Sequence, residues 1–72
     1  MTRGTANAIL RQVEALGYAV SVHHMREYVE LHAVHLSGEG IPHVAWCEGD
    51  GEEAVYRAAC ALAEMVGIRL EE

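Results

Sequence analysis

The 72-residue chain contains no lysine, and its only basic side chains besides histidine are five arginines scattered along the sequence. With eleven acidic residues the formal net charge at pH 7 is −6. Proteins that bind the phosphate backbone of nucleic acids need clustered Lys and Arg side chains to displace counterions. The charge balance therefore argues against a nucleic-acid partner, while a basic protein partner stays possible.

Cysteine is also scarce, and no apolar run approaches the roughly 20 residues of a membrane-spanning helix. Cys47 and Cys60 are too few for a disulfide framework, and nothing resembles a signal peptide. We expect a soluble cytoplasmic protein with two free thiols. A chain of this length forms one domain, residues 1–72, with a marginal core and no room for a buried cofactor, so no cofactor is expected.

The best-specified element is a helix from Asp50 to Ile68. Asp50 is a suitable N-cap with Glu53 completing a capping box, and Gly67 is suited to a left-handed C′ position. Most of its other positions are apolar, giving an arc wider than a helix on one sheet needs. Two interpretations follow: a helix wedged between the sheet and a neighbouring helix, or one that also meets another subunit.

The rest of the chain predicts a second helix and three strands. A first helix runs from Thr5, its cap, to Leu16, with Gly17 as the stop. Period-two patterns predict strands at Tyr18–Met25, Tyr28–Leu36 and Ile41–Cys47. The predicted fold class is α+β with the order αβββα. This is a three-stranded antiparallel meander packed against two helices, a layout also found in double-stranded-RNA-binding domains.

Two turns fix a predicted register. Closing the hairpins around Arg26-Glu27 and Gly38-Glu39 sorts the strand residues into two faces. The apolar face, which should pack on the helices, collects Val20, Val22, Val29, Leu31, Ala33, Val44 and Trp46. The mixed face collects Ser21, His23, Met25, Tyr28, Glu30, His32, Val34, His43, Ala45 and Cys47.

The chain has five histidines, and the mixed face suggests two uses for some of them. His23, Glu30, His32 and Cys47 converge in this register and carry zinc-type ligand atoms, although no recognised spacing such as C-x-x-C is present. Alternatively the histidines face solvent or a dimer interface, where their protonation near pH 6 would weaken association.

His24 has a structural and a catalytic interpretation. At the end of the first strand it can cap the core through one hydrogen-bonded nitrogen, or act as a general acid or base in RNA cleavage, with His23 as the alternative residue. The segment LGYAVSVHHM resembles the stretch that ends in the active histidine of HicA-type mRNA-interferase toxins. In this chain Ser21-Val22 replaces the toxins' Gly-Ser.

The end of the chain, VAWCEGDGEEAVYRAACALAEMVGI, resembles small phage-encoded "ABA sandwich" domains. In those domains a strand leads through an acidic turn into a helix similar to A-I-C-R-A-A-L, and residues 54–59 match that run with Tyr56 where Cys is common. The resemblance implies a helix–sheet–helix layout and a phage or prophage origin. It implies no activity and no functional residues.

Together these observations predict a non-enzymatic interaction module that forms a homodimer and binds another protein. The expected contacts come from the mixed face or the last helix: Met25, Tyr28, Val34, Tyr56 and Ala63. The alternatives are an RNA-associated or HicA-like nuclease module and, third, a metal-binding domain.

Overall fold

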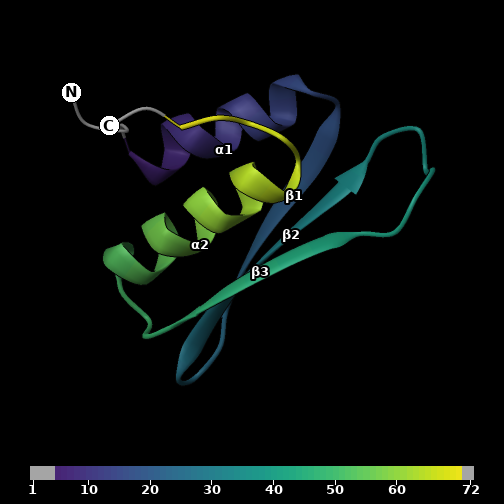
Figure 1. The fold of residues 1–72 in the computed structure, drawn as a ribbon. Helices are drawn as coiled ribbons and strands as arrows, with labels where there is room; N and C mark the ends of the chain where they lie inside the picture. Colours follow the sequence, from purple (N-terminus) through teal and green to yellow (C-terminus); the bar gives the residue numbers. More distant parts are fainter. Residues whose placement is uncertain (1–4, 71–72) are drawn as a thin grey trace.

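A computed structural model describes residues 5–70 of the chain. Its elements follow the order α1 (Ala6–Ala15), β1 (Tyr18–His24), β2 (Tyr28–His35), β3 (His43–Glu48) and α2 (Glu52–Met65). The three strands form an antiparallel sheet in the order β1-β2-β3, and both helices lie on the same face of it (Figure 1). The predicted αβββα meander is therefore confirmed, whereas the predicted frayed start at residues 1–4 lies outside the described residues.

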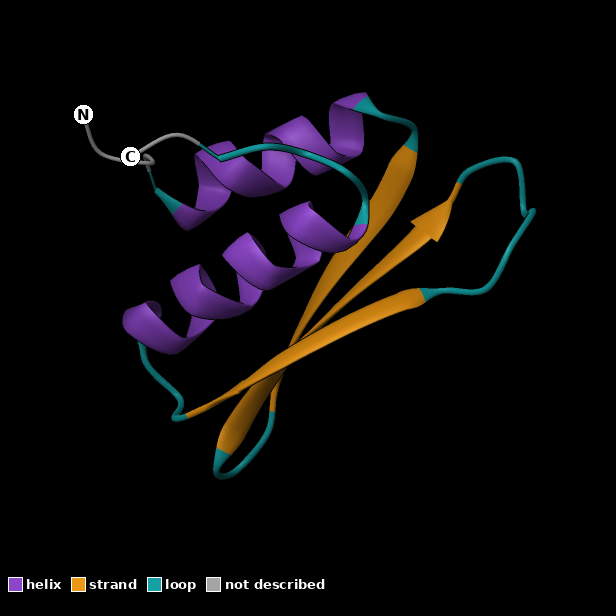
Figure 2. Ribbon diagram, in the orientation of Figure 1, coloured by secondary structure: helices purple, strands orange, loops and turns teal. Residues whose placement is uncertain are grey.

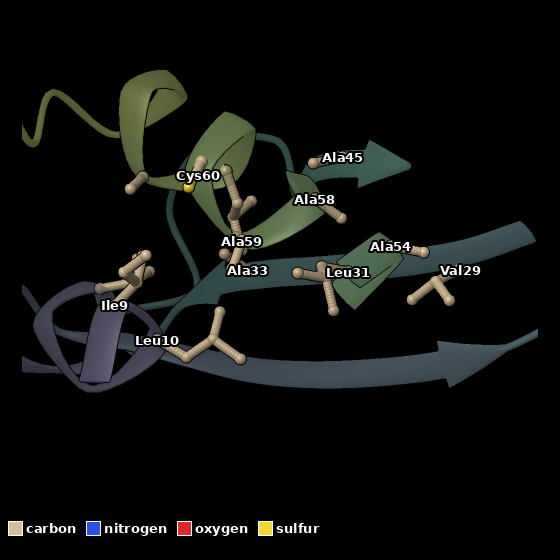
Figure 3. Packing of buried hydrophobic residues seen from close by; sticks show 13 residues of the cluster. Ile9, Leu10, Val29, Leu31, Ala33, Ala45, Ala54, Ala58, Ala59 and Cys60 are labelled. Carbon is tan, nitrogen blue, oxygen red and sulfur yellow. The ribbon is translucent and has the colours of Figure 1, made fainter. Parts of the chain in front are cut away.

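The core lies between the helix layer and one sheet face (Figures 2 and 3). Ile9, Leu10 and Val13 of α1 pack with the alternate residues of β2 and with a row of small residues on α2. The alanines at positions 54, 58, 59 and 63 let α2 approach both α1 and the sheet closely. Most of the apolar arc of α2 is thus packed between α1 and the sheet, as a helix wedged between these elements requires, whereas Met65 at its end is 49% exposed.

Local signals explain the N-terminus of α1 and the C-terminus of α2. The Thr5 hydroxyl accepts a hydrogen bond from the Ala8 amide at 3.2 Å, as predicted for the α1 cap. After α2, the Ile68 amide bonds to the Ala63 carbonyl and the Gly67 amide to the Glu64 carbonyl, which is a Schellman motif with Gly67 at φ 88°. The predicted Asp50 cap is wrong: Gly51 is the N-cap of α2, and no side chain accepts there.

The first hairpin has the predicted register. Val20 pairs with Ala33 and Val22 with Leu31, and the Met25 amide donates to the Tyr28 carbonyl at 2.9 Å to close a two-residue loop. No residue of that loop has a positive φ, so Arg26-Glu27 avoids the type I′ conformation for which these residues are unsuited.

The second hairpin is shifted by one residue from the prediction. A turn over His35–Gly38, with Gly38 at φ 79°, begins a longer connection with an odd residue count. Ala45 now pairs with Leu31 and His43 with Ala33. Because side chains alternate between faces, every residue of β3 changes sides.

The shift moves Val44 and Trp46 off the predicted core face and places Ala45 against the helices instead. Ala45 is buried, while Trp46 is 62% exposed. Leu16, the C-cap of α1, and Met65, the last residue of α2, are also exposed. No helix in the described part of the chain is long and apolar enough to cross a membrane.

Candidate interaction surface

The sheet face opposite the helices, called here the open face, is uncovered by any element in residues 5–70 (Figure 2). By the observed register and strand alternation it carries Ala19, Ser21, His23, Tyr28, Glu30, His32, Val34, Val44, Trp46 and Glu48. It combines an apolar half on β2 and β3 with a polar half centred on β1 and β2.

The apolar half is built around Trp46. Val34 and Val44 are 44% and 42% exposed, and the Tyr28 ring meets the Trp46 ring edge-on, with centroids 6.3 Å apart. Tyr28 and Trp46 come from neighbouring strands and are diagonal neighbours, since Trp46 pairs directly with Glu30. Large exposed apolar side chains in contact with one another are typical of a binding surface.

The polar half is a continuous chain of side-chain contacts. A hydrogen bond of 3.0 Å links Ser21 Oγ to His23 Nε2, and the His23 and His32 rings lie 4.4 Å apart between centroids. His32 Nε2–H in turn donates to Glu30 Oε1 at 2.9 Å. The one carboxylate in the middle of this face is therefore engaged by an imidazole.

Of the four predicted metal ligands, the structure brings three together. His23, Glu30 and His32 share the open face, but the register shift puts Cys47 on the helix face, packed against the core. Within residues 5–70 no group of three or more His, Cys, Asp or Glu side chains is arranged to hold a metal ion. The predicted convergence of the four side chains is wrong.

His24 does not cap the core, contrary to the structural prediction. It is exposed, has no hydrogen-bond partner among the described residues, and lines an open cleft of about 830 Å³ between the N-terminal ends of the two helices. Asp50, Glu52 and Glu53 line the same cleft. His23 points to the opposite face of the sheet, so the two catalytic candidates lie apart.

The predicted contact residues divide between available and buried positions. Val34 and Met25 are exposed, and Tyr28 and Tyr56 are half-buried. Ala63, on α2, is fully buried against the neighbouring elements of the fold, so its assignment to an interface is wrong. Trp46 and Val44, which the predicted register assigns to the core, belong to the exposed surface instead.

A second aromatic cluster also escaped the sequence analysis. At the other end of the helix face, Tyr18 lies edge-on to His35 and His43, with centroids 5.1 and 5.7 Å away. His35 Nδ1 accepts from the Ser37 amide at 3.2 Å and lies 2.7 Å from its hydroxyl, which anchors the β2–β3 connection. This cluster has a structural role, and the first hairpin register, which pairs Tyr18 with His35, could have predicted part of it.

Both thiols are free, as predicted, with Cys60 buried in the core. The chain matches no protein-family model, and no curated protein or solved structure matches it either.

Proposed function

We propose that this protein is a non-enzymatic interaction module that self-associates by packing its open face on the same face of a second copy. The observation that carries the proposal is an uncovered sheet face with Trp46, Val34 and Val44 exposed together on it. In a two-layer domain the sheet face opposite the helices is usually polar, because it is in contact with water. Apolar side chains that are exposed together on such a face therefore indicate that another surface covers them.

Charge supports a second copy as the occupant. The chain carries a net charge of −6, so two copies that meet through most of their surface would repel each other. The open face is the exception, since Glu30 is paired with His32 and the other carboxylate, Glu48, lies at its margin. Two such faces can approach without placing unpaired acids opposite one another.

Area supports the same conclusion. Three strands of about seven residues, at ~3.3 Å per residue and ~4.8 Å between strands, give a face of about 23 by 14 Å, or roughly 320 Å² in projection. The protruding side chains make the accessible area larger than this projection. Two copies would therefore bury more than about 640 Å², which fits a weak, reversible dimer.

The nuclease alternative has less support from the geometry. His24 shares its cleft with three carboxylates, which repel a phosphate group, and His23 lies on the other side of the sheet. A general acid–base pair must be within reach of one reacting group, and these two histidines are not.

The test is the solution mass, measured by light scattering coupled to size exclusion between about 5 and 500 μM protein. We expect reversible self-association through the open face, seen as a mass that rises with concentration, and Trp46→Ser should weaken it. A chain that stays monomeric throughout this range would refute self-association and would make a different protein the partner of the open face. The same measurement with zinc and with a chelator tests the metal alternative, for which the mass must fall when metal is removed.

A further inference from the structure

The outer edge of β1 is a second unpartnered feature of the sheet, separate from the open face. β1 pairs with β2 on one side only, and within residues 5–70 no strand adds to its other side. An edge strand presents a row of free amide and carbonyl groups that another strand can pair with.

Two backbone bonds define which groups face that edge. The Met25 amide donates to the Tyr28 carbonyl, and the Leu36 amide donates to the Gly17 carbonyl at 2.8 Å. Both bonds involve odd-numbered residues at the two ends of β1, and hydrogen-bonded positions alternate along an antiparallel pair. The amides and carbonyls of Tyr18, Val20, Val22 and His24 therefore point away from β2.

In the described part of the chain, none of the usual devices protects this edge. β1 has the sequence YAVSVHH, which contains no carboxylate, lysine, arginine, proline or glycine, and its seven pairs with β2 run without a bulge. Natural edge strands are normally blunted by one of these devices. β3, the opposite edge, is shorter, follows Pro42 directly and ends on Glu48.

We propose that β1 pairs with β1 of a second copy, antiparallel and with Ser21 opposite Ser21 on the two-fold axis. This register aligns all seven residues and places Val20 of one copy opposite Val22 of the other. The backbone amides and carbonyls of both residues point away from β2, so the two residues can exchange the hydrogen bonds that an antiparallel pair requires. Ala19 then faces His23, and no two carboxylates or arginines are opposed. The result is one continuous six-stranded sheet with all four helices on the same side.

The burial of β1 supports this occupant. Val22 lies on the helix face, yet it is 40% exposed, because the helices cover mainly the first half of β1. In the two-fold arrangement the uncovered half of one strand lies beside the covered half of the other. Val22 thereby gains Val20 of the second copy as a neighbour, next to the second copy's α1.

Single cysteines can test the register directly. Residues opposite each other at a position that is not hydrogen-bonded lie about 4.5 Å apart between Cα atoms, within the range for a disulfide. In a Cys47→Ala background, where the remaining thiol Cys60 is buried, we would introduce Ser21→Cys, Ala19→Cys or His23→Cys and oxidise mildly. Covalent dimer would be quantified by mass spectrometry.

The expected result is efficient dimer formation for Ser21→Cys and at least tenfold less for Ala19→Cys or His23→Cys alone. A mixture of the Ala19→Cys and His23→Cys chains should cross-link as well as Ser21→Cys does, because these positions face each other. Equal yields at all three positions, or no covalent dimer from a folded Ser21→Cys chain, would overturn the proposal.

The same series in a Trp46→Ser chain separates this contact from the open face. Trp46 lies on β3, two strands from the β1 edge, so the Ser21→Cys yield should not change there. A yield that falls tenfold would mean that residue 21 meets its copy through the open face, and the edge proposal would fail. If Ser21→Cys still cross-links and Trp46→Ser leaves the solution mass unchanged, the edge contact would be sustained and the proposed function refuted.

Discussion

Trp46 should account for much of the affinity between two open faces. A tryptophan side chain offers about 250 Å² of surface, and at 62% exposure roughly 150 Å² remains to be covered by a partner. Full burial at ~25 cal/mol per Å² would contribute about 4 kcal/mol. Because the entropy and desolvation costs of association offset part of the gain from buried area, we expect Trp46 to contribute about 2 kcal/mol of binding free energy in each copy.

The substitution Trp46→Ser changes both copies of a symmetric dimer. The free energy of dimerisation should therefore weaken by about 4 kcal/mol, so the dissociation constant should rise roughly 1,000-fold. Sedimentation equilibrium over a wide concentration range measures it. Ile41→Ser is the matched control, since Ile41 is 87% exposed but lies in the β2–β3 connection rather than on the open face.

Two outcomes would refute this reasoning. The first is a Trp46→Ser chain that dimerises like the wild type; the second is an Ile41→Ser chain that dissociates equally, which would indicate nonspecific apolar association. At concentrations where the chains are monomeric, Ile41→Ser should keep its free energy of unfolding within about 0.5 kcal/mol of the wild type, and Trp46→Ser, which loses its edge-on contact with Tyr28, within about 1.5 kcal/mol.

Two further predictions concern the core and a turn. Leu31→Ala removes a fully buried side chain from the central strand and should lower the free energy of unfolding by about 2–5 kcal/mol in urea titrations; a loss below 1 kcal/mol would contradict the core described here. Gly17→Ala should cost at least ~1–2 kcal/mol in the same assay, because Gly17 has φ 97° and the new Cβ would lie 3.1 Å from His35 Nε2; an unchanged midpoint would refute that strain.

The element order could be predicted from the sequence because local signals agree with the hydrophobic period. Thr5, Gly17 and Gly67 mark helix ends by chemistry that acts within one turn of the chain. The register of the first hairpin could also be predicted, because a one-residue slip would move Val22 and Leu31 off the helix face.

The register of the second hairpin could not be predicted from the sequence, and the composition of the candidate surface depends on that register. The sequence between His35 and His43 contains two glycines that both adopt φ 79°, and hydrophobicity favoured burying Trp46 and Val44. The closely packed alanines of α2 instead leave space only for a small residue, Ala45, at that position. The size of a neighbouring helix's side chains is a tertiary property, which the pattern of a single strand does not contain.

The placement of α2 also has a consequence for synthesis on the ribosome. Within residues 5–70, six of the thirteen buried hydrophobic residues belong to α2, the last of the five elements described there. Until α2 has emerged, the meander and α1 have no surface to close the core, so the nascent chain should remain unfolded and its apolar strands accessible to chaperones. Folding should then occur in one cooperative step once residues 52–65 leave the exit tunnel, and arrest at earlier positions should yield protease-sensitive chains.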